Sequence, residues 1–80
     1  MEIDIHGLHL WEAIDEIIYS LEECRVRNID HITIIHGYRH GNVLKDYIRS
    51  KGFIKEVKRA GFHLKMSGTR NQGETHFKID

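Results

Sequence analysis

Two histidines, each followed directly by a glycine, are the side chains of this sequence that are best suited to proton transfer. The tripeptide Ile-His-Gly occurs at residues 5–7 and again at 35–37, and each copy closes a short run of β-branched residues. Asp4 lies two residues before His6, so in a strand both side chains project from the same face. A histidine exchanges protons near neutral pH, and a carboxylate can orient it or bind a divalent metal ion. These residue types indicate phosphate binding or phosphate chemistry.

The order of apolar and polar residues predicts the elements that must position these side chains. Helical spacing of apolar residues predicts helices over 10–27 and 42–51. Alternation and β-branched runs predict strands over 2–6, 31–36 and 74–79. Residues 53–58 and 61–66 are weaker strand candidates, which form either a hairpin or only one strand. Gly52 is expected just beyond the end of the second helix, and residues 67–73 are expected to form a polar loop.

Together these elements predict a single domain over residues 1–80, with a two-layer α/β sandwich in the order β-α-β-α-β-β. The helical stretch between the first two strands fits a right-handed crossover between parallel strands. The carboxyl ends of neighbouring parallel strands meet at one edge of the sheet, where ligands bind in open α/β folds. We therefore expect His6 and His36 to lie side by side, next to a glycine-bounded loop over 37–41.

Charge is distributed unevenly along a chain whose formal net charge is zero. Residues 1–37 hold two basic and eight acidic side chains, and residues 38–80 hold ten basic and four acidic ones, which makes net charges of −6 and +6. Such asymmetry suits a side that faces a polyanion, and it equally suits ordinary solvated helix surface.

The same composition excludes several classes of protein. Cys24 is the single cysteine, so the sequence holds neither a disulfide framework nor a cysteine-based zinc site. No run of about 18 apolar residues is present, and the first residues lack the basic and apolar regions of a signal peptide. We therefore expect no membrane partner and a cytoplasmic location.

Two interpretations stay open for each candidate residue at the predicted edge. His6 and His36 either transfer protons or cap their strands and support the loops. Gly37 and Gly41 either let backbone amides approach a phosphate or serve turn geometry alone. The further candidates for nucleic-acid contact are Gly7, Tyr38, Arg39, His40, Lys45, Arg49, Arg70 and Asn71.

These further candidates differ in what they would contribute. An aromatic ring such as Tyr38 can stack on an unpaired base, and the arginine and lysine side chains can neutralise phosphates. His40 follows His36 by four residues, a spacing that suits a metal pair on a helix. Here it falls in a glycine loop with no third strong ligand nearby in the sequence, so we expect no metal site from these residues.

Three short motifs carry a resemblance that spans nearly the whole chain. Residues 3–8, Ile-Asp-Ile-His-Gly-Leu, resemble the L-D-x-H-G-L opening of the Smr (small MutS-related) domain. Residues 34–41, Ile-Ile-His-Gly-Tyr-Arg-His-Gly, followed by Leu44 and Lys45, resemble its second motif, H-G-x-G-x-G-x-L-R. Residues 71–75, Asn-Gln-Gly-Glu-Thr, resemble its N-x-G-x-T turn. The sequence departs from the pattern at 38–40, where the central glycine is expected.

The resemblance implies a fold like the C-terminal domain of translation initiation factor 3. It also implies binding of DNA or RNA, with endonuclease activity in many members and a link to DNA repair and recombination or to RNA quality control. Asp4 and His6 match the functional pair of the first motif, and His36, Gly37 and Gly41 match the second. The chain is then either a stand-alone protein or part of a larger repair protein.

Two chemistries fit this expectation, and whether the chain is an enzyme stays open at this point. On RNA the 2′-hydroxyl attacks, and histidines can move the protons without a metal. On DNA water must attack, and a Mg²⁺ or Mn²⁺ ion held by Asp4 would help most. The alternatives are a non-catalytic module for branched or single-stranded nucleic acid and a protein–protein adaptor that uses the acidic first helix.

Overall fold

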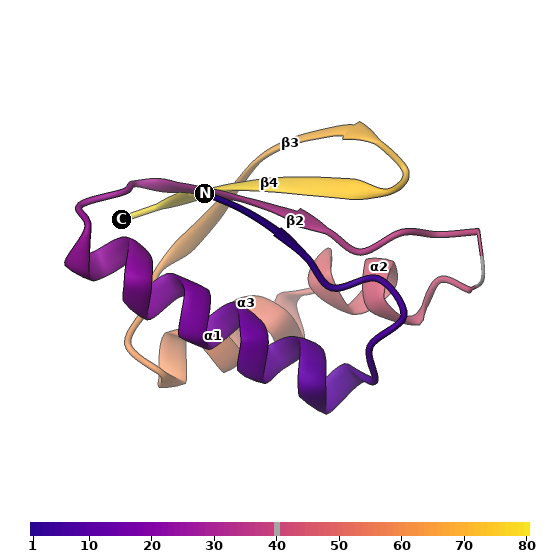
Figure 1. The fold of residues 1–80 in the computed structure, drawn as a ribbon, viewed down its shortest axis with the longest axis horizontal. Coiled ribbons are helices and arrows are strands. Elements are labelled where there is room, and N and C mark those ends of the chain that lie inside the picture. The colour runs from indigo at the N-terminus through magenta and orange to yellow at the C-terminus, as the bar shows by residue number, and fades with distance from the viewer. Residues whose placement is uncertain (40) are drawn as a thin grey trace.

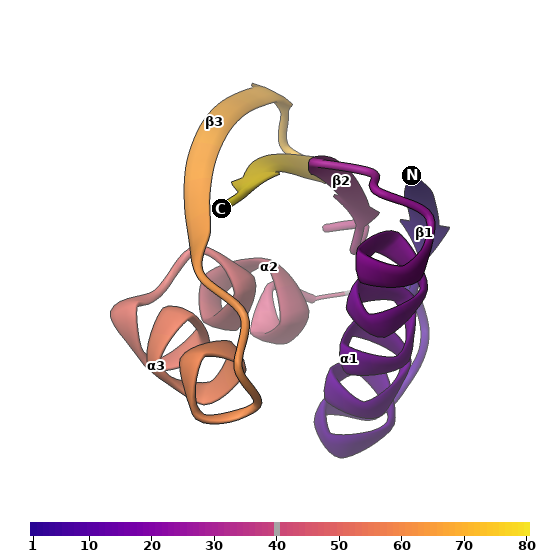
Figure 2. The ribbon, with the colours of Figure 1, turned by 90° about the vertical axis from the view of Figure 1, so that its left-hand side faces the viewer.

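Three helices cover one face of a four-stranded sheet in the part of the chain that the structure describes (Figures 1 and 2). The computed structural model describes residues 1–39 and 41–80, without the side chain of Arg70. The elements are, in chain order, β1 (Glu2–Asp4), α1 (Leu10–Val26), β2 (His31–Ile35), α2 (Val43–Ile48), α3 (Lys51–Arg59), β3 (Leu64–Asn71) and β4 (Glu74–Ile79). The predicted two-layer α/β sandwich is confirmed.

The two Ile-His-Gly segments leave the sheet at the same edge. The strand order is β1-β2-β4-β3, in which β1 and β2 are parallel and β4 is antiparallel to both of its neighbours. Asp4 pairs with Ile35, and the Ile5 amide donates a hydrogen bond to the Ile35 carbonyl over 2.9 Å. The predicted parallel crossover is therefore confirmed.

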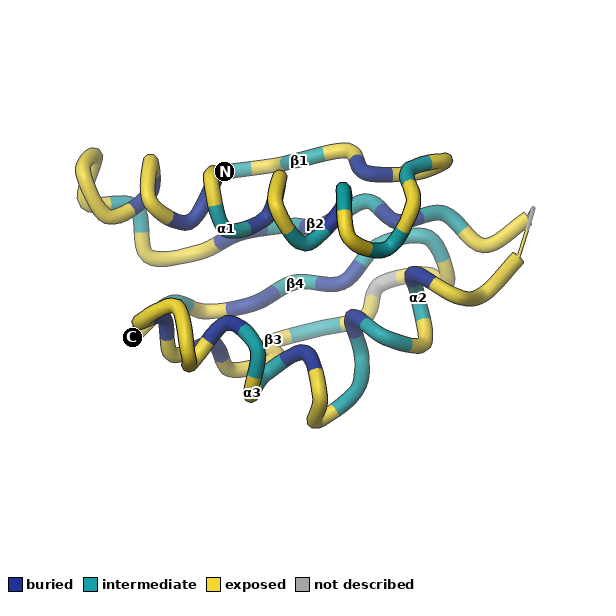
Figure 3. Tube along the Cα trace, turned by 90° about the horizontal axis from the view of Figure 1, so that it is seen from below, coloured by how far each residue is buried: buried dark blue, intermediate teal, exposed yellow. Residues whose placement is uncertain are grey.

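The apolar core lies between the sheet and the helices (Figure 3). β2 and β4 bury alternate residues and turn the others to the open face of the sheet, because successive side chains point to opposite faces. In β2 the buried residues are Ile32 and Ile34, and His36 continues this series into the interior. In β1 the exposed residues are Glu2 and Asp4, and the solvent-facing series continues with His6.

The segment after α2 corrects two sequence predictions, because residues 53–58 form part of α3 and Gly52 lies in its first turn. Phe53 and Val57 are four residues apart and both fully buried, which is helical rather than strand periodicity. Ser50 separates the two helices: its hydroxyl donates to the Tyr47 carbonyl at 2.6 Å and accepts from the Phe53 amide at 3.3 Å. A serine at this cap position ends one helix and begins the next.

The predicted polar loop over 67–73 is also wrong, since β3 continues to Asn71 and only Gln72 and Gly73 form the turn to β4. β3 is an edge strand with β4 as its neighbour. Its pairing shifts register between Met66 and Gly68 and again before Asn71. Bulges of this kind are common at sheet edges and let polar, glycine-containing sequence remain in a strand.

None of the helices in the described residues is long and apolar enough to cross a membrane.

Candidate active site

Asp4 and His6 form a hydrogen-bonded pair on the open side of the β1 end. Asp4 Oδ1 accepts from the ring Nδ1 of His6 at 2.5 Å and from the His6 backbone amide at 3.1 Å. These hydrogen bonds lower the pKa of the Asp4 carboxyl below its usual value, so it is ionised at neutral pH. An ionised carboxylate can only accept, so His6 carries its hydrogen on Nδ1 when neutral.

This tautomer leaves the Nε2 lone pair of His6 available as a base. The His6 side chain is 70% exposed and the Asp4 side chain 51% exposed, so substrate can reach the imidazole. A carboxylate behind an imidazole orients the ring and stabilises the imidazolium that forms when Nε2 takes a proton. The pair thus has the geometry of a general base with its orienting group.

His36, in contrast, is 3% exposed and bonds to the protein through both ring nitrogens. Its Nδ1 lies 2.9 Å from the Gly37 carbonyl, which only accepts, so Nδ1 donates. Its Nε2 lies 2.8 Å from the hydroxyl of Thr75, which also accepts from Arg49 Nε at 2.9 Å. Burial lowers the pKa of His36, and the charges of Arg49 and Lys45 act in the same direction.

A neutral His36 therefore accepts the Thr75 hydrogen, and the hydrogen bonds run in one direction, from Arg49 through Thr75 and His36 to Gly37. Arg49 also donates to the backbone carbonyls of Asn71 and Glu74 at 2.8 and 2.9 Å. These contacts favour the loop-supporting interpretation of His36. They also engage Nε and Nη2 of Arg49 within the chain, and phosphate contact by Arg49 stays a prediction.

The side chains of His6 and His36 point to opposite faces of the sheet, although their strands end side by side. Because Asp4 pairs with Ile35, the residue beside His6 is Gly37 rather than His36. A Cβ atom on Gly37 would lie 3.3 Å from the Cβ of His6, and Gly37 has a φ of +73°. Glycine at this position therefore permits both the turn and the close approach of the two segments.

The backbone amides of Gly37 and Gly41 are engaged within the chain. Gly37 donates to the Gly73 carbonyl at 3.1 Å, as does His36 at 3.0 Å, and Gly41 donates to the Tyr38 carbonyl at 3.4 Å. These contacts favour turn geometry over phosphate binding by the two amides. They also attach the turn between β3 and β4 to the second Ile-His-Gly segment.

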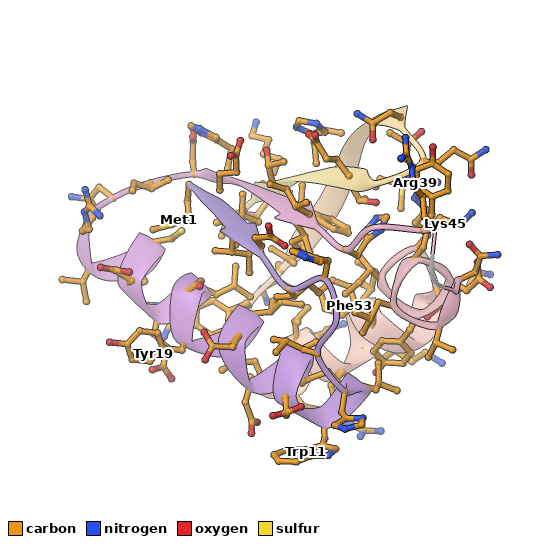
Figure 4. All side chains as sticks on the ribbon, turned by 45° about the vertical axis from the view of Figure 1, so that its right-hand side comes forward. Met1, Trp11, Tyr19, Arg39, Lys45 and Phe53 are labelled. Atoms are coloured by element: carbon orange, nitrogen blue, oxygen red, sulfur yellow. The ribbon has the colours of Figure 1, made fainter. Side chains whose placement is uncertain are left out.

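This turn forms one wall of the site. The Asn71 side chain accepts from the Gly73 amide at 2.8 Å, which shapes the turn, and Lys45 Nζ donates to the Gln72 side chain at 2.9 Å across to α2. In Figure 4, Arg39 and Lys45 lie at the same end of the molecule, distant from Met1 and Tyr19. The structure thus gathers residues from both motif loops and from the β3–β4 turn at one end.

A cleft of about 530 Å³ opens between these segments. The candidate residues that line it are His6, Gly7, His36, Gly37, Tyr38, Arg39, Gly41 and Asn71. Asp4 lies behind His6, and Lys45 and Arg49 lie outside the lining. His40 and the side chain of Arg70 lie outside the described part of the chain.

Sequence reasoning missed the apolar part of the lining, which consists of Leu8, Ile35, Val43 and Leu44. It also gave Thr75 no role. The one sequence signal for Thr75 is its place in the N-x-G-x-T motif, because local sequence does not show which distant residues a buried hydroxyl will contact. Among the described residues, no three histidine, cysteine or acidic side chains come together as metal ligands. The carboxylates at this end of the molecule are Asp4, behind His6, and Glu74, which lines the cleft and which the sequence reasoning also missed.

The family model described as the Smr domain matches residues 3–75. Two curated proteins named Endonuclease MutS2 are similar in sequence. The one from Finegoldia magna is 31% identical over 65 residues, 78% of this chain and 8% of the relative. The one from Clostridioides difficile is 35% identical over 57 residues, 68% of this chain and 7% of the relative. The chain thus spans less than a tenth of the length of these relatives.

Among solved structures, the crystal structure of the Smr domain of Thermus thermophilus MutS2 superimposes with a TM-score of 0.66 and 25% sequence identity. The match covers 99% of this chain and 96% of that domain.

Proposed function

This chain belongs to the Smr domain family, and on that premise we propose that it binds nucleic acid and cleaves it as an endonuclease. The observation that carries the proposal is the Asp4–His6 pair, whose exposed imidazole stands at a cleft of about 530 Å³. The relatives named as endonucleases support the same reaction class.

In the proposed reaction, His6 Nε2 removes a proton from the attacking oxygen, and Asp4 stabilises the resulting imidazolium. On RNA the attacking oxygen is the ribose 2′-hydroxyl. It displaces the 5′-oxygen of the next nucleotide and leaves a 2′,3′-cyclic phosphate. The imidazolium then returns its proton to the departing oxygen. His36, being buried and bonded at both nitrogens, is a positioning residue that supports the Gly37 loop.

On DNA the attacking group is water, and a Mg²⁺ or Mn²⁺ ion would polarise the phosphate. Asp4 Oδ1 is already bonded to His6, and the second carboxylate at the cleft, Glu74, does not join it in a group of three metal ligands among the described residues. A divalent ion there would take its other ligands from substrate phosphates and water, as Mg²⁺ commonly does. The chain's own residues therefore suit RNA cleavage better than metal-dependent DNA nicking.

The cleft favours an unpaired nucleotide as the reacting unit. Its volume lies within the usual range of about 300–1,000 Å³ for ligand pockets, and its apolar lining suits the face of a base. Tyr38, 42% exposed at its edge, could stack on that base, and each such stack contributes about 1–3 kcal/mol. Arg39 beside it would contact a flanking phosphate.

A non-catalytic module for branched or single-stranded nucleic acid is the second candidate. The second motif favours it, because Tyr38, Arg39 and His40 stand where the family pattern has its central glycine. In the relatives, which are about ten times longer than this chain, the matching segment is one part of a larger protein. Either activity would serve DNA repair or RNA quality control.

The test is cleavage of end-labelled single-stranded RNA, supercoiled DNA and branched DNA, each with EDTA and with Mg²⁺ or Mn²⁺. The chain offers a matched control, because Asp30 and His31 form a second exposed pair, with a 3.2 Å hydrogen bond, at the start of β2. We expect Asp4→Ala/His6→Ala to abolish cleavage and Asp30→Ala/His31→Ala to retain it.

Equal cleavage by both double variants would refute the catalytic role of the Asp4–His6 pair. No cleavage by the wild type, together with salt-dependent binding, would make the binding module the better conclusion.

A further inference from the structure

The exposed face of α3 carries a row of lysines that the cleft does not use. Lys51, Lys55 and Lys58 are exposed and follow one another at helical spacing, while Phe53 and Val57 are buried on the opposite side of the helix. Among the described residues, no carboxylate lies at ion-pairing distance from these three lysines, because the one acidic side chain of α3 bonds to Arg59 instead. We call these three residues the α3 lysine row.

The helix that carries the α3 lysine row, α3, lies on one side of the helical layer, and α1 lies on the other (Figures 2 and 3). The surface of α1 is acidic, with five carboxylates against one arginine. The opposite charges of the two halves of the sequence therefore occupy opposite sides of the molecule. A polyanion that approaches the domain is attracted to the α3 side and repelled from the α1 side.

The chain leads from the cleft end of the molecule directly into the α3 lysine row. α2, whose Lys45 reaches the wall of the site, leads into α3 through Arg49 and Ser50. From Lys51 to Lys58 the helix rises about 10 Å, which equals about three phosphate steps along one strand. About three phosphates of one strand can therefore lie along the row.

We propose that the α3 lysine row is a second phosphate-binding surface, which holds the sugar–phosphate backbone of the nucleic acid several nucleotides away from the cleft. This inference rests on the proposed function, because it assigns a path to the same substrate. A second phosphate-binding surface requires a substrate longer than the cleft alone would hold. It also places the path of the bound strand along α3 and away from α1.

The consequence can be measured as salt dependence. Each phosphate neutralised by a lysine steepens the fall of log affinity with log salt by about 0.7–0.9. Lys51→Gln/Lys55→Gln/Lys58→Gln should therefore reduce this slope by about 2 for a 20-nucleotide strand. Between 50 and 200 mM salt, the wild type then loses about 16-fold more affinity than the variant. A 4-nucleotide strand that fills only the cleft should bind both proteins equally.

The control removes the same charge from other sides of the molecule, as Arg27→Gln/Lys65→Gln/Lys78→Gln, all three residues being exposed. Fluorescence anisotropy with labelled 4- and 20-nucleotide RNA and DNA reports affinity at each salt concentration, and circular dichroism checks that each variant folds. Equal slopes for the two triple variants would overturn the inference and leave the proposed function standing. Failure of the wild type to bind either strand would overturn both.

Discussion

Replacing Thr75 by valine removes one buried hydroxyl and keeps the shape of the side chain. Thr75 is fully buried, and its hydroxyl connects His36 Nε2 at 2.8 Å with Arg49 Nε at 2.9 Å. In the variant, the His36 nitrogen has no hydrogen to accept, while Arg49 keeps its bonds to the carbonyls of Asn71 and Glu74. The main cost is therefore one unsatisfied buried acceptor.

An acceptor left unpaired in the interior costs about 1–3 kcal/mol. The loss of the Arg49 bond adds to this cost, and the greater apolarity of valine offsets part of it, so we expect the free energy of unfolding to fall by about 2 kcal/mol. For a small domain whose urea m-value is about 1 kcal/mol/M, the midpoint would move by about 2 M. The measurement is urea unfolding followed by far-ultraviolet circular dichroism.

Thr33→Val is the matched control. The Thr33 hydroxyl makes one hydrogen bond, to His76 Nδ1 at 2.9 Å, on the partly exposed side of the sheet. We expect it to cost less than about 1 kcal/mol, because water can replace the lost partner. A Thr75→Val protein within about 0.5 kcal/mol of the wild type, or a larger effect at Thr33, would contradict the hydrogen-bond chain through His36.

Two further predictions concern the same end of the molecule. Gly37→Ala should destabilise the domain by about 1–2 kcal/mol and reduce cleavage, because its φ is +73° and the new Cβ would crowd His6. Gly7→Ala is the control, since Gly7 has a φ of +80° with open space around it. It should strain only the backbone and therefore lower the free energy of unfolding by less, as measured by urea unfolding. Burial lowers the pKa of His36 from 6.5, so as the pH falls this histidine is protonated in the unfolded chain before it is protonated in the folded one. The free energy of unfolding therefore declines below about pH 6.5, by at most about 1.4 kcal/mol per pH unit. Urea unfolding at pH 7.5 and pH 5.5 should show this loss in the wild type and a smaller one in His36→Gln, and equal losses would refute the assignment.

Sequence reasoning was most successful where a pattern is local and regular. The apolar stripe of α1, the alternation in β1 and β4 and the β-branched run of β2 each reflect one buried face, so their elements were correctly predicted. It failed at α3 and over the second half of β3, whereas the strand predicted over 61–66 overlaps the start of β3. There a serine cap separates two short helices, and an edge strand tolerates glycine and polar residues, so local composition was misleading.

For the site, the sequence by itself determined that the two Ile-His-Gly segments meet and that Asp4 contacts His6. The two Ile-His-Gly copies end neighbouring parallel strands, and the spacing of Asp4 and His6 puts both side chains on one face, so the pair follows from local geometry. Its hydrogen-bonded contact needs no distant part of the chain. The opposite net charges of residues 1–37 and 38–80 also follow from the sequence alone.

Only the tertiary structure decided what each histidine does. The register between β1 and β2 pairs Asp4 with Ile35, so His6 stands beside Gly37 on the open face while His36 turns into the interior. A shift of one residue in a sheet exchanges its faces, and identical tripeptides therefore acquire different roles. Two alike motifs in sequence thus become one exposed base and one buried support, because strand register depends on packing across the whole sheet.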